Sequence, residues 1–206
     1  ARFPVGYMSP LHTHTASHTG VTLTDGVLHG ASEEGSVVLP KGSSWRQPGG
    51  EPHVGGCKGE SPCDMLLFFE GAIDMAVTES PFAEPALKMI SAEAFEWKEL
   101  KGGVKMAVIH GNPKEGAFQA LLEYPAGMTT NVHTHTASFT GALLAGTHHR
   151  GPSPDALVTL TEGSVWSEPA GSPHMEKCGA ERSCVFIGGM DGPLDTHNVE
   201  LTPVAE

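Results

Sequence analysis

Short apolar runs alternate with turn residues along the whole chain. Runs such as Met106–Ile109 and Phe118–Leu122 are interleaved with 26 Gly and 16 Pro residues. Gly and Pro interrupt regular structure, and apolar runs this short between them are more typical of strands than of helices. The pattern therefore predicts an all-β fold made of many short strands joined by turns.

The pattern also occurs twice, with a constant offset of 121 positions. The register runs without a gap from Phe3 to Asp74 in the first copy and from Tyr124 to Asp195 in the second. The matched positions include Gly6/Gly127, His12/His133, His14/His135, Gly42/Gly163, Pro48/Pro169, Gly50/Gly171, Pro52/Pro173 and His53/His174. A chain of 206 residues can bury two cores of about 100 residues each. We expect two domains, at residues 1–85 and 86–206.

The two copies differ in what precedes them. Residues 86–119 come before the second copy and contain strand-like runs, whereas nothing comparable stands before Ala1. We expect the opening strands of the first domain to be missing from this sequence, as in a processed or truncated chain. The alternative is that another part of the chain, or a partner, supplies them.

The histidine triplets of both copies lie in sequence that is typical of strands. Alternate side chains of a strand share one face. On that face the first copy carries His12, His14 and His18. The second copy carries His133, His135 and, in the position of His18, Phe139.

His53 and His174 each follow a turn rich in Pro and Gly, which marks the start of another strand. If that strand lies across a barrel from the histidine triplet, three imidazoles converge in each copy. Neutral imidazole suits Fe, Mn, Zn, Ni or Cu, and three ligands leave coordination positions open. We therefore predict one divalent transition metal per domain, with His12, His14, His18 and His53 as ligands in the first and His133, His135 and His174 in the second.

Some residues outside these patterns have simpler interpretations. A single His-x-His is common in strands, so it is the duplication that makes the metal sites specific. The remaining histidines, His29, His110, His148, His149 and His197, are expected at the surface or in the core. Trp45 and Trp166 match across the copies and are expected to pack in the core. Glu51 and Glu176 lie close to the last histidines and are expected to be solvated, so the lumens should be poor in acid and base groups.

Four cysteines occupy matching places in the two copies. Cys57 and Cys63 bracket one five-residue turn, and Cys178 and Cys184 bracket another. Cysteines that face each other across a hairpin can meet disulfide geometry without backbone movement. We expect disulfides Cys57–Cys63 and Cys178–Cys184, and with them a periplasmic or secreted protein. The alternative is buried free thiols in a cytosolic protein.

The charge balance limits the partners. The formal net charge is −12, which favours neither nucleic acid nor an anionic membrane surface as a partner. No apolar run reaches the length of roughly 18 residues that a membrane-spanning helix needs. A small molecule is the expected partner of the metal sites.

The histidine patterns resemble the two sequence motifs of the cupin superfamily. Gly6, His12 and His14 fit the first motif, Gly-x5-His-x-His, and Gly127, His133 and His135 fit it again. Gly42, Pro48, Gly50 and His53 fit the second motif, as do Gly163, Pro169, Gly171 and His174. The resemblance covers both copies and implies a bicupin: two double-stranded β-helix (jelly-roll) barrels in tandem, each with a metal in its lumen. With the string HTHTAS and the CxxxxxC spacing, the chain is most similar to uncharacterised bacterial two-cupin proteins.

The chain departs from the cupin motifs at two places in each copy. His18 and Phe139 stand where the family usually has a glutamate ligand. Cys57 and Cys178 replace the final asparagine of the second motif. The departures imply a four-histidine site in the first domain and a more open three-histidine site, beside an apolar wall, in the second.

The resemblance implies a metal-dependent enzyme that acts on a small organic substrate. Three-histidine cupins include dioxygenases, so a dioxygenase-like oxidoreductase is the leading hypothesis. The alternatives are a non-enzymatic, metal-loaded ligand-binding or sensing module, as in zinc cupins, and a structural protein. Jelly-roll barrels have strand edges that pair readily, so we also expect a homodimer.

Overall fold

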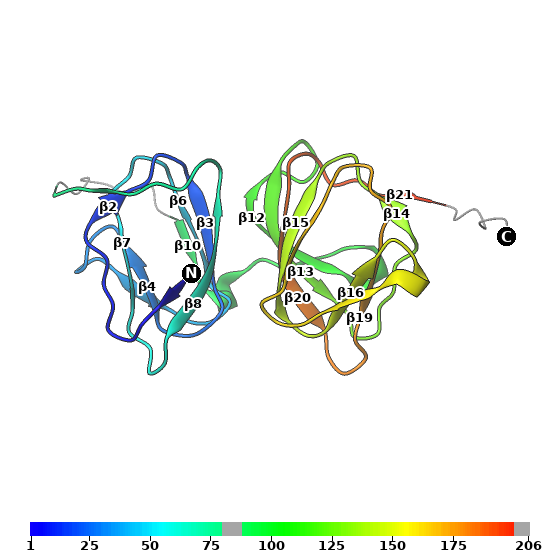
Figure 1. The fold of residues 1–206 in the computed structure, drawn as a ribbon, viewed down its shortest axis with the longest axis horizontal. Coiled ribbons are helices and arrows are strands. Elements are labelled where there is room, and N and C mark those ends of the chain that lie inside the picture. The colour runs from blue at the N-terminus through cyan, green and yellow to red at the C-terminus, as the bar shows by residue number, and fades with distance from the viewer. Residues whose placement is uncertain (80–87, 200–206) are drawn as a thin grey trace. The chain divides into compact units, whose positions relative to one another are not determined.

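A computed structural model describes residues 1–79 and 88–199 of the chain. The protein is all-β, as predicted, and its two barrels have the double-stranded β-helix (jelly-roll) architecture (Figure 1). In the described residues the only helical segments are three short 3-10 turns. The chain divides into two compact units, Ala1–Phe95 and Glu96–Glu206. The boundary expected between residues 85 and 86 lies outside the described residues.

The first barrel contains a five-stranded sheet, a three-stranded sheet and a two-stranded ribbon. The strand orders are β1-β8-β3-β6-β10, β5-β4-β7 and β2-β9. The elements are β1 (Arg2–Phe3), β2 (His12–Thr13), β3 (His18–Thr22), β4 (Val27–Gly30), β5 (Val37–Leu39), β6 (Ser44–Gln47), β7 (Val54–Cys57), β8 (Cys63–Phe69), β9 (Ala76–Val77), β10 (Lys88–Ile90) and η1 (Ala92–Ala94).

The second barrel repeats this plan with a larger main sheet. Its strand orders are β11-β12-β13-β20-β15-β18, β17-β16-β19 and β14-β21. The elements are β11 (Lys98–Glu99), η2 (Lys101–Gly103), β12 (Lys105–Gly111), β13 (Phe118–Tyr124), β14 (His133–Thr134), β15 (Phe139–Ala145), β16 (His148–Gly151), η3 (Pro154–Ala156), β17 (Val158–Leu160), β18 (Val165–Glu168), β19 (Met175–Cys178), β20 (Cys184–Met190) and β21 (His197–Asn198).

The main sheets differ at their outer strands. In the second barrel, all seven residues of β20 pair with β13, and β13 pairs in turn with β12. In the first barrel, the matching strand β8 pairs with β1 only at Cys63 and Asp64. At the other end of that sheet, β10 covers β6, whereas β18 is the outer strand of the second sheet.

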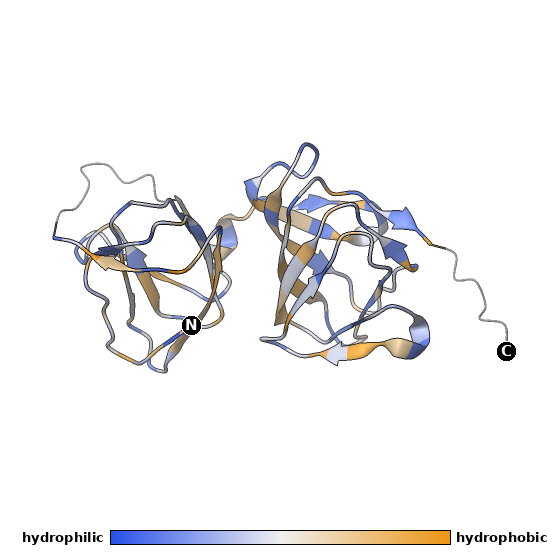
Figure 2. Cartoon of the chain, turned by 45° about the horizontal axis from the view of Figure 1, so that its top comes forward, coloured by the Kyte–Doolittle hydropathy of each residue, from blue (hydrophilic) through white to orange (hydrophobic). Residues whose placement is uncertain are grey.

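Each core is built on alternation along the strands, which Figure 2 shows as apolar and polar residues mixed along the sheets. Trp45 is only 2% exposed and confirms the expected core packing. It lies directly across from Gly20, where a Cβ atom would come within 2.1 Å of the indole. Gly141 and Trp166 repeat this contact. The glycine of β3 and of β15 therefore makes room for a tryptophan from the neighbouring strand.

Both predicted disulfides are present. Cys57–Cys63 has a Cα–Cα distance of 5.6 Å and Cys178–Cys184 one of 5.7 Å. Each closes the hairpin between two consecutive strands of its barrel, β7–β8 and β19–β20. The described part of the chain has no helix with the length and apolar composition required to cross a membrane.

Candidate metal centres and the pocket of the second barrel

Backbone hydrogen bonds bring the two histidine patterns of each barrel together. The amides of His12 and His53 each donate to the carbonyl of the other, at 3.0 and 2.9 Å. His133 and His174 form the same bridge, at 2.8 and 2.9 Å. The main chain itself therefore fixes the spacing of two ligands in each barrel.

The turn before the last histidine docks on the histidine triplet as well. Gly50 has a φ of +79° and donates its amide to the carbonyl of His14 at 2.8 Å. Gly171, with a φ of +74°, makes the equivalent bond to His135 at 2.8 Å. Residues other than glycine rarely adopt such a φ. This explains why the motif has glycine at that position.

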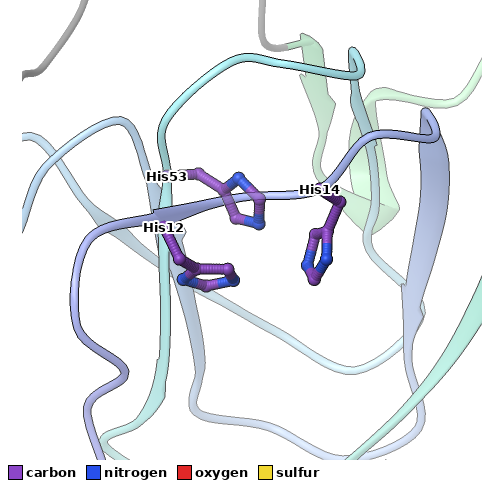
Figure 3. A group of neighbouring side chains, drawn as sticks. All are labelled: His12, His14 and His53. Atoms are coloured by element: carbon purple, nitrogen blue, oxygen red, sulfur yellow. The ribbon is translucent and has the colours of Figure 1, made fainter. Parts of the chain in front are cut away.

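Each barrel gathers three histidines around one point. The available ligand nitrogens of His12, His14 and His53 lie within 4.8 Å of one another. Figure 3 shows the three rings turned toward a common space, with His12 and His14 arriving from one segment and His53 from another. The second barrel repeats this arrangement with His133, His135 and His174, again within 4.8 Å. The six predicted ligands other than His18 are thus brought together in two triads.

The hydrogen bonds of the triads leave the correct nitrogen free for a metal. In all six rings Nδ1 is bonded to a backbone carbonyl oxygen, which can only accept, so Nδ1 carries the proton. The pairs are His12 with Pro10, His14 with Asp74, His53 with Glu51, His133 with Asn131, His135 with Asp195 and His174 with Ser172. The neutral ring then presents the lone pair of Nε2, and the buried Nε2 of His174 has no hydrogen-bond partner within residues 1–79 and 88–199. A divalent metal bound by three imidazoles fits this donor set.

Burial keeps four of these histidines neutral. Desolvation lowers the pKa of His53 to about 4 and that of His174 to about 4. It also lowers the pKa of His12 and of His133. Neighbouring imidazoles act in the same direction, because each would repel a second positive charge. At neutral pH these four rings are therefore ready to bind a cation without first losing a proton.

His18 lies beside the first triad and not within it. The prediction that His12, His14 and His18 share one continuous strand was wrong, because β2 ends at Thr13 and the chain turns before β3 begins at His18. The His18 ring centroid is 5.1 Å from that of His14 and 4.6 Å from that of Phe69. The ring is buried, its Nδ1 has no partner among the described residues, and burial lowers its pKa to about 3.

The lumen of the first barrel is lined by further rings. His29 of β4 is buried, stacks on Trp45 at 4.7 Å and lies 5.3 Å from His53, measured between ring centroids. Its Nε2 is 3.3 Å from the side-chain oxygen of Gln47. His29 is thus a hydrogen-bonded core histidine, which agrees with its sequence interpretation.

The matching part of the second barrel is charged, which the sequence interpretation missed. Arg150 of β16 occupies the position of His29 and is only 6% exposed. Its guanidinium bonds to Glu176 and lies 3.4 Å from Glu168. The hydroxyl of Tyr124 donates to the other oxygen of Glu176 at 2.6 Å. Glu176 is 4% exposed, so the expectation of a solvated carboxylate was wrong, and so was that of a second lumen poor in acid and base groups.

A pocket of about 600 Å³ opens beside the second triad. His133 and His135 line it together with Tyr124, Arg150 and Glu176. Phe139, in the position of His18, forms part of an otherwise largely apolar wall and lies 5.6 Å below the guanidinium carbon of Arg150. Metal ligands, an ion-paired arginine, a phenol and apolar walls therefore face the same space.

His148 is buried behind this cluster. It has no exposed surface, and neither ring nitrogen has a hydrogen-bond partner in the part of the chain that the structure describes. Its ring stacks on Phe186 at 5.3 Å, and its Nε2 is 3.9 Å from Glu176. Burial and the charge of Arg150 lower the pKa of His148 to about 3, so the ring is neutral.

Several solved structures share this fold. A dioxygenase candidate from Nostoc punctiforme aligns with a TM-score of 0.79 and 13% identity, over 98% of this chain and 72% of that chain. An oxalate decarboxylase variant from Bacillus subtilis aligns with a TM-score of 0.65 and 15% identity, over 96% and 69%. A salicylate 1,2-dioxygenase variant from Pseudoaminobacter salicylatoxidans aligns with a TM-score of 0.65 and 13% identity, over 92% and 69%. These are cupin structures, so the cupin fold expected from the motifs is confirmed.

The sequence comparisons are narrower. No curated protein matches the sequence. The model of one family does match, and its description is a domain of unknown function, DUF4437. The match spans residues 1–187, which include both histidine triads and both disulfides. The chain therefore belongs to the DUF4437 family.

Proposed function

We propose that the protein is a metal-dependent enzyme of the dioxygenase type, acting on a small organic substrate in the second barrel. The observation that carries this proposal is the pocket of about 600 Å³ in which two histidines of the second triad meet Arg150, Glu176 and Tyr124. A pocket of this size suits a small organic ligand. The fold neighbours that act on oxalate and salicylate are consistent with such chemistry but do not fix it.

One divalent transition metal per barrel, Fe, Mn, Zn, Ni or Cu, is the proposed cofactor. The triads His12/His14/His53 and His133/His135/His174 would hold it through Nε2. A bound iron or manganese would supply open coordination positions for substrate oxygens and dioxygen. His18 would join the first site as a fourth ligand after a small movement of its ring.

The residues of the second pocket would bind and orient the substrate. Arg150 carries one positive charge, and the carboxylates of Glu168 and Glu176 both pair with it. Phe139 and its apolar neighbours exclude water, which strengthens electrostatic interactions in the pocket. An organic molecule with an apolar body and an oxygen-bearing end matches these walls.

Tyr124 and Glu176 are placed to move a proton. Burial raises the pKa of Tyr124 to about 12, so its hydroxyl stays protonated and donates to Glu176. When a substrate hydroxyl donates its proton to the Tyr124 oxygen, the phenolic proton can pass to Glu176. This relay would leave the substrate oxygen deprotonated and the phenol intact, with Glu176 as the final base.

A non-enzymatic, metal-loaded ligand-binding or sensing module is the second candidate. The first barrel favours it, because His18, His29, Phe69 and Trp45 fill the space beside its triad with rings. Such a site would bind metal without an adjoining cluster of acid and base groups. Tight ligand binding without turnover would be its signature.

The test is oxygen uptake by protein reconstituted with Fe²⁺ or Mn²⁺ and offered β-diketones, catechols and keto acids. We expect turnover with at least one class, abolished by Tyr124→Phe with Glu176→Gln and retained in His12→Ala. Activity that disappears in His12→Ala but survives in His133→Ala would place the reaction in the first barrel. Silence with every substrate and both metals, together with tight ligand binding, would favour the sensing module.

The setting of the protein is part of the proposal. Two disulfides suit a periplasmic or secreted location, where thiols are oxidised. Outer strands such as β18 suit pairing between copies in a homodimer. Cell fractionation tests the first statement, and analytical ultracentrifugation tests the second.

A further inference from the structure

The loop between β8 and β9 is tied to the first histidine triplet by one aspartate. Asp74 accepts the amide of Thr15 on Oδ1 at 2.8 Å and the Thr15 hydroxyl on Oδ2. The backbone carbonyl of the same aspartate accepts the Nδ1 proton of His14. One residue thus holds the neighbour of a candidate ligand with its side chain and the ligand itself with its main chain.

The second barrel repeats these three contacts, and Asp195 also lies 3.2 Å from Nε2 of His197. Asp195 accepts the amide of Thr136 on Oδ1 at 2.9 Å and the Thr136 hydroxyl on Oδ2. Its carbonyl accepts the Nδ1 proton of His135. The two aspartates stand 121 positions apart and make the same contacts, although the residues around the two triads differ. This repetition indicates that the contacts belong to the candidate metal centre and are not particular to one loop.

We propose that Asp74 and Asp195 are positioning residues that latch the second ligand of each triad, and that this latch sets the metal affinity of each site. The proposal rests on the metal binding proposed above. The aspartates do not touch the metal. They fix which ring nitrogen carries the proton and where the other nitrogen points.

The physical reason lies in where the ring bond of the middle histidine comes from. The rings of His12 and His53 bond to carbonyls only two residues away in the chain. The ring of His14 bonds to the carbonyl of Asp74, which is 60 residues away. Metal-bound histidines need their other ring nitrogen hydrogen-bonded to keep tautomer and orientation. The loop that offers the carbonyl is exposed, so the bonds of its carboxylate to Thr15 supply the order that burial does not.

In the second barrel the latched loop is also part of the pocket. Leu194, Thr196 and Asn198 line the pocket on either side of Asp195. The same stretch forms β21, which pairs with β14 through His133 and Thr134. The bonds of Asp195 therefore order His135 and one wall of the pocket together. Metal binding should order this wall in return, because coupling between two sites is reciprocal.

The test compares the two latches in variants that keep one metal site. His12→Ala combined with His53→Ala removes the first site, because only His14 and His18 are left there, and Co²⁺ titration then reports the dissociation constant of the second site. In that background we expect Asp195→Ala to weaken Co²⁺ binding by roughly 10- to 100-fold. Asp74→Ala in the same background removes the other latch and is the matched control, with unchanged Co²⁺ binding. Equal binding with and without Asp195 would overturn the latch.

Threonine variants separate the latch from a general loss of loop structure. Thr136→Val removes the hydroxyl donor but keeps the amide, so we expect an intermediate loss of Co²⁺ affinity. Thr136→Ser restores the donor and should restore the affinity. If Thr136→Val and Thr136→Ser bind Co²⁺ equally, the hydroxyl contact has no positioning role and the proposal fails.

Two readouts remain informative if the protein binds no metal at all. Nitrogen NMR of metal-free protein should give the Nδ1-protonated tautomer for His135, lost or averaged in Asp195→Ala. Hydrogen exchange of residues 194–199 should be slower in the wild type than in Asp195→Ala. A wild type that binds no Co²⁺ would contradict the proposed cofactor and the effect of the latch on metal affinity. An unchanged His135 tautomer and unchanged hydrogen exchange in Asp195→Ala would contradict the latch, even if the protein binds metal.

Discussion

The two barrels hold the same three ligands in the same way and surround them differently. Beside the first triad stand neutral rings, His18 and His29. In the matching positions beside the second triad stand Phe139 and Arg150, and Arg150 is ion-paired with Glu176. The two copies thus share the arrangement of three histidines, and the second adds an ion-paired cluster beside a pocket. Under the proposed function, the comparison teaches that the histidine triad and the residues beside it can vary independently.

The two lumens differ in the free-energy cost of burying their polar side chains. Buried neutral histidines lose hydration but carry no charge, so the first lumen is stable at neutral pH without ion pairs. Burying a charged guanidinium costs far more free energy than burying a neutral ring. In the second lumen the ion pairs with carboxylates offset that cost. Burial lowers the pKa of Arg150 while Glu168 raises it. Such clusters of perturbed groups are found preferentially at functional sites.

The largest effect is expected from removing one ligand in each barrel. His133→Ala should abolish metal binding in the second barrel and reduce turnover to background, since the proposed substrate pocket adjoins that triad. His12→Ala should remove one metal per chain as well but leave turnover intact. Metal analysis by mass spectrometry and oxygen uptake measure both properties. Equal loss of activity in the two variants would mean that the barrels are not specialised.

The next largest effect is expected at the position where the barrels differ in charge. Arg150→Ala leaves Glu176 buried without its cation, which should lower the free energy of unfolding by about 3–5 kcal/mol. His29→Ala, at the matching position, removes a neutral ring and should cost about 2 kcal/mol. Urea denaturation of the two variants measures the difference. A larger cost for His29→Ala would contradict the assignment of the ion-paired cluster.

Acid should destabilise both barrels of the metal-free protein. Folding holds the pKa of His18 and of His148 at about 3 and that of His53 and of His174 at about 4, below the ordinary value of 6.5. The unfolded chain therefore takes up protons first, so stability is intact above pH 6.5 and falls between about pH 6.5 and 3. Each such histidine adds a slope of up to about 1.4 kcal/mol per pH unit.

Urea denaturation at a series of pH values tests this dependence, with hydrogen exchange to separate the barrels. The first barrel should lose protection at higher pH, because the pKa of His29 is also held well below its ordinary value. A stability that is flat from pH 7 to 4 would show that these rings are hydrated in solution.

The smallest effect is expected from exchanging the residues at the variable ligand position. His18→Phe gives the first site the residue that the second site has at the matching position. If His18 binds the metal as a fourth imidazole, the variant should lower the metal affinity of the first site by about tenfold, which is about 1.4 kcal/mol of binding free energy. The metal stoichiometry should not change. Co²⁺ titration in the His133→Ala background measures it. Unchanged affinity would leave His18 as a packing residue against Phe69.

Sequence reasoning predicted the histidine triads, which both copies carry, and missed the charged cluster, which only the second copy has. The triads were predictable because both copies carry the histidines at the same spacing. The continuous strand through His12 and His18 was wrong because contacts distant in sequence, from Asp74 to Thr15, bend the chain there. Local strand preference cannot reveal such a bend.

The charged cluster was missed because it is assembled from three separate strands. Tyr124, Arg150 and Glu176 come from β13, β16 and β19. A signal was present nonetheless. His148 and Arg150 alternate along one strand, and Glu176 follows His174 by two positions, so each pair shares a face. Without a partner strand in view, a charged residue at such a position is indistinguishable from a solvated one.

The backbone bridge between His12 and His53, repeated by His133 and His174, bears on how such a protein can change. These bonds join amide to carbonyl, so side-chain substitutions at neighbouring positions leave the bonding groups in place. Substitutions can then change the residues that line a lumen, from neutral to charged or from closed to open, while the three histidines keep their arrangement. A library that randomises the pocket lining of the second barrel, but keeps its triad and Gly171, should therefore yield many variants that still load metal.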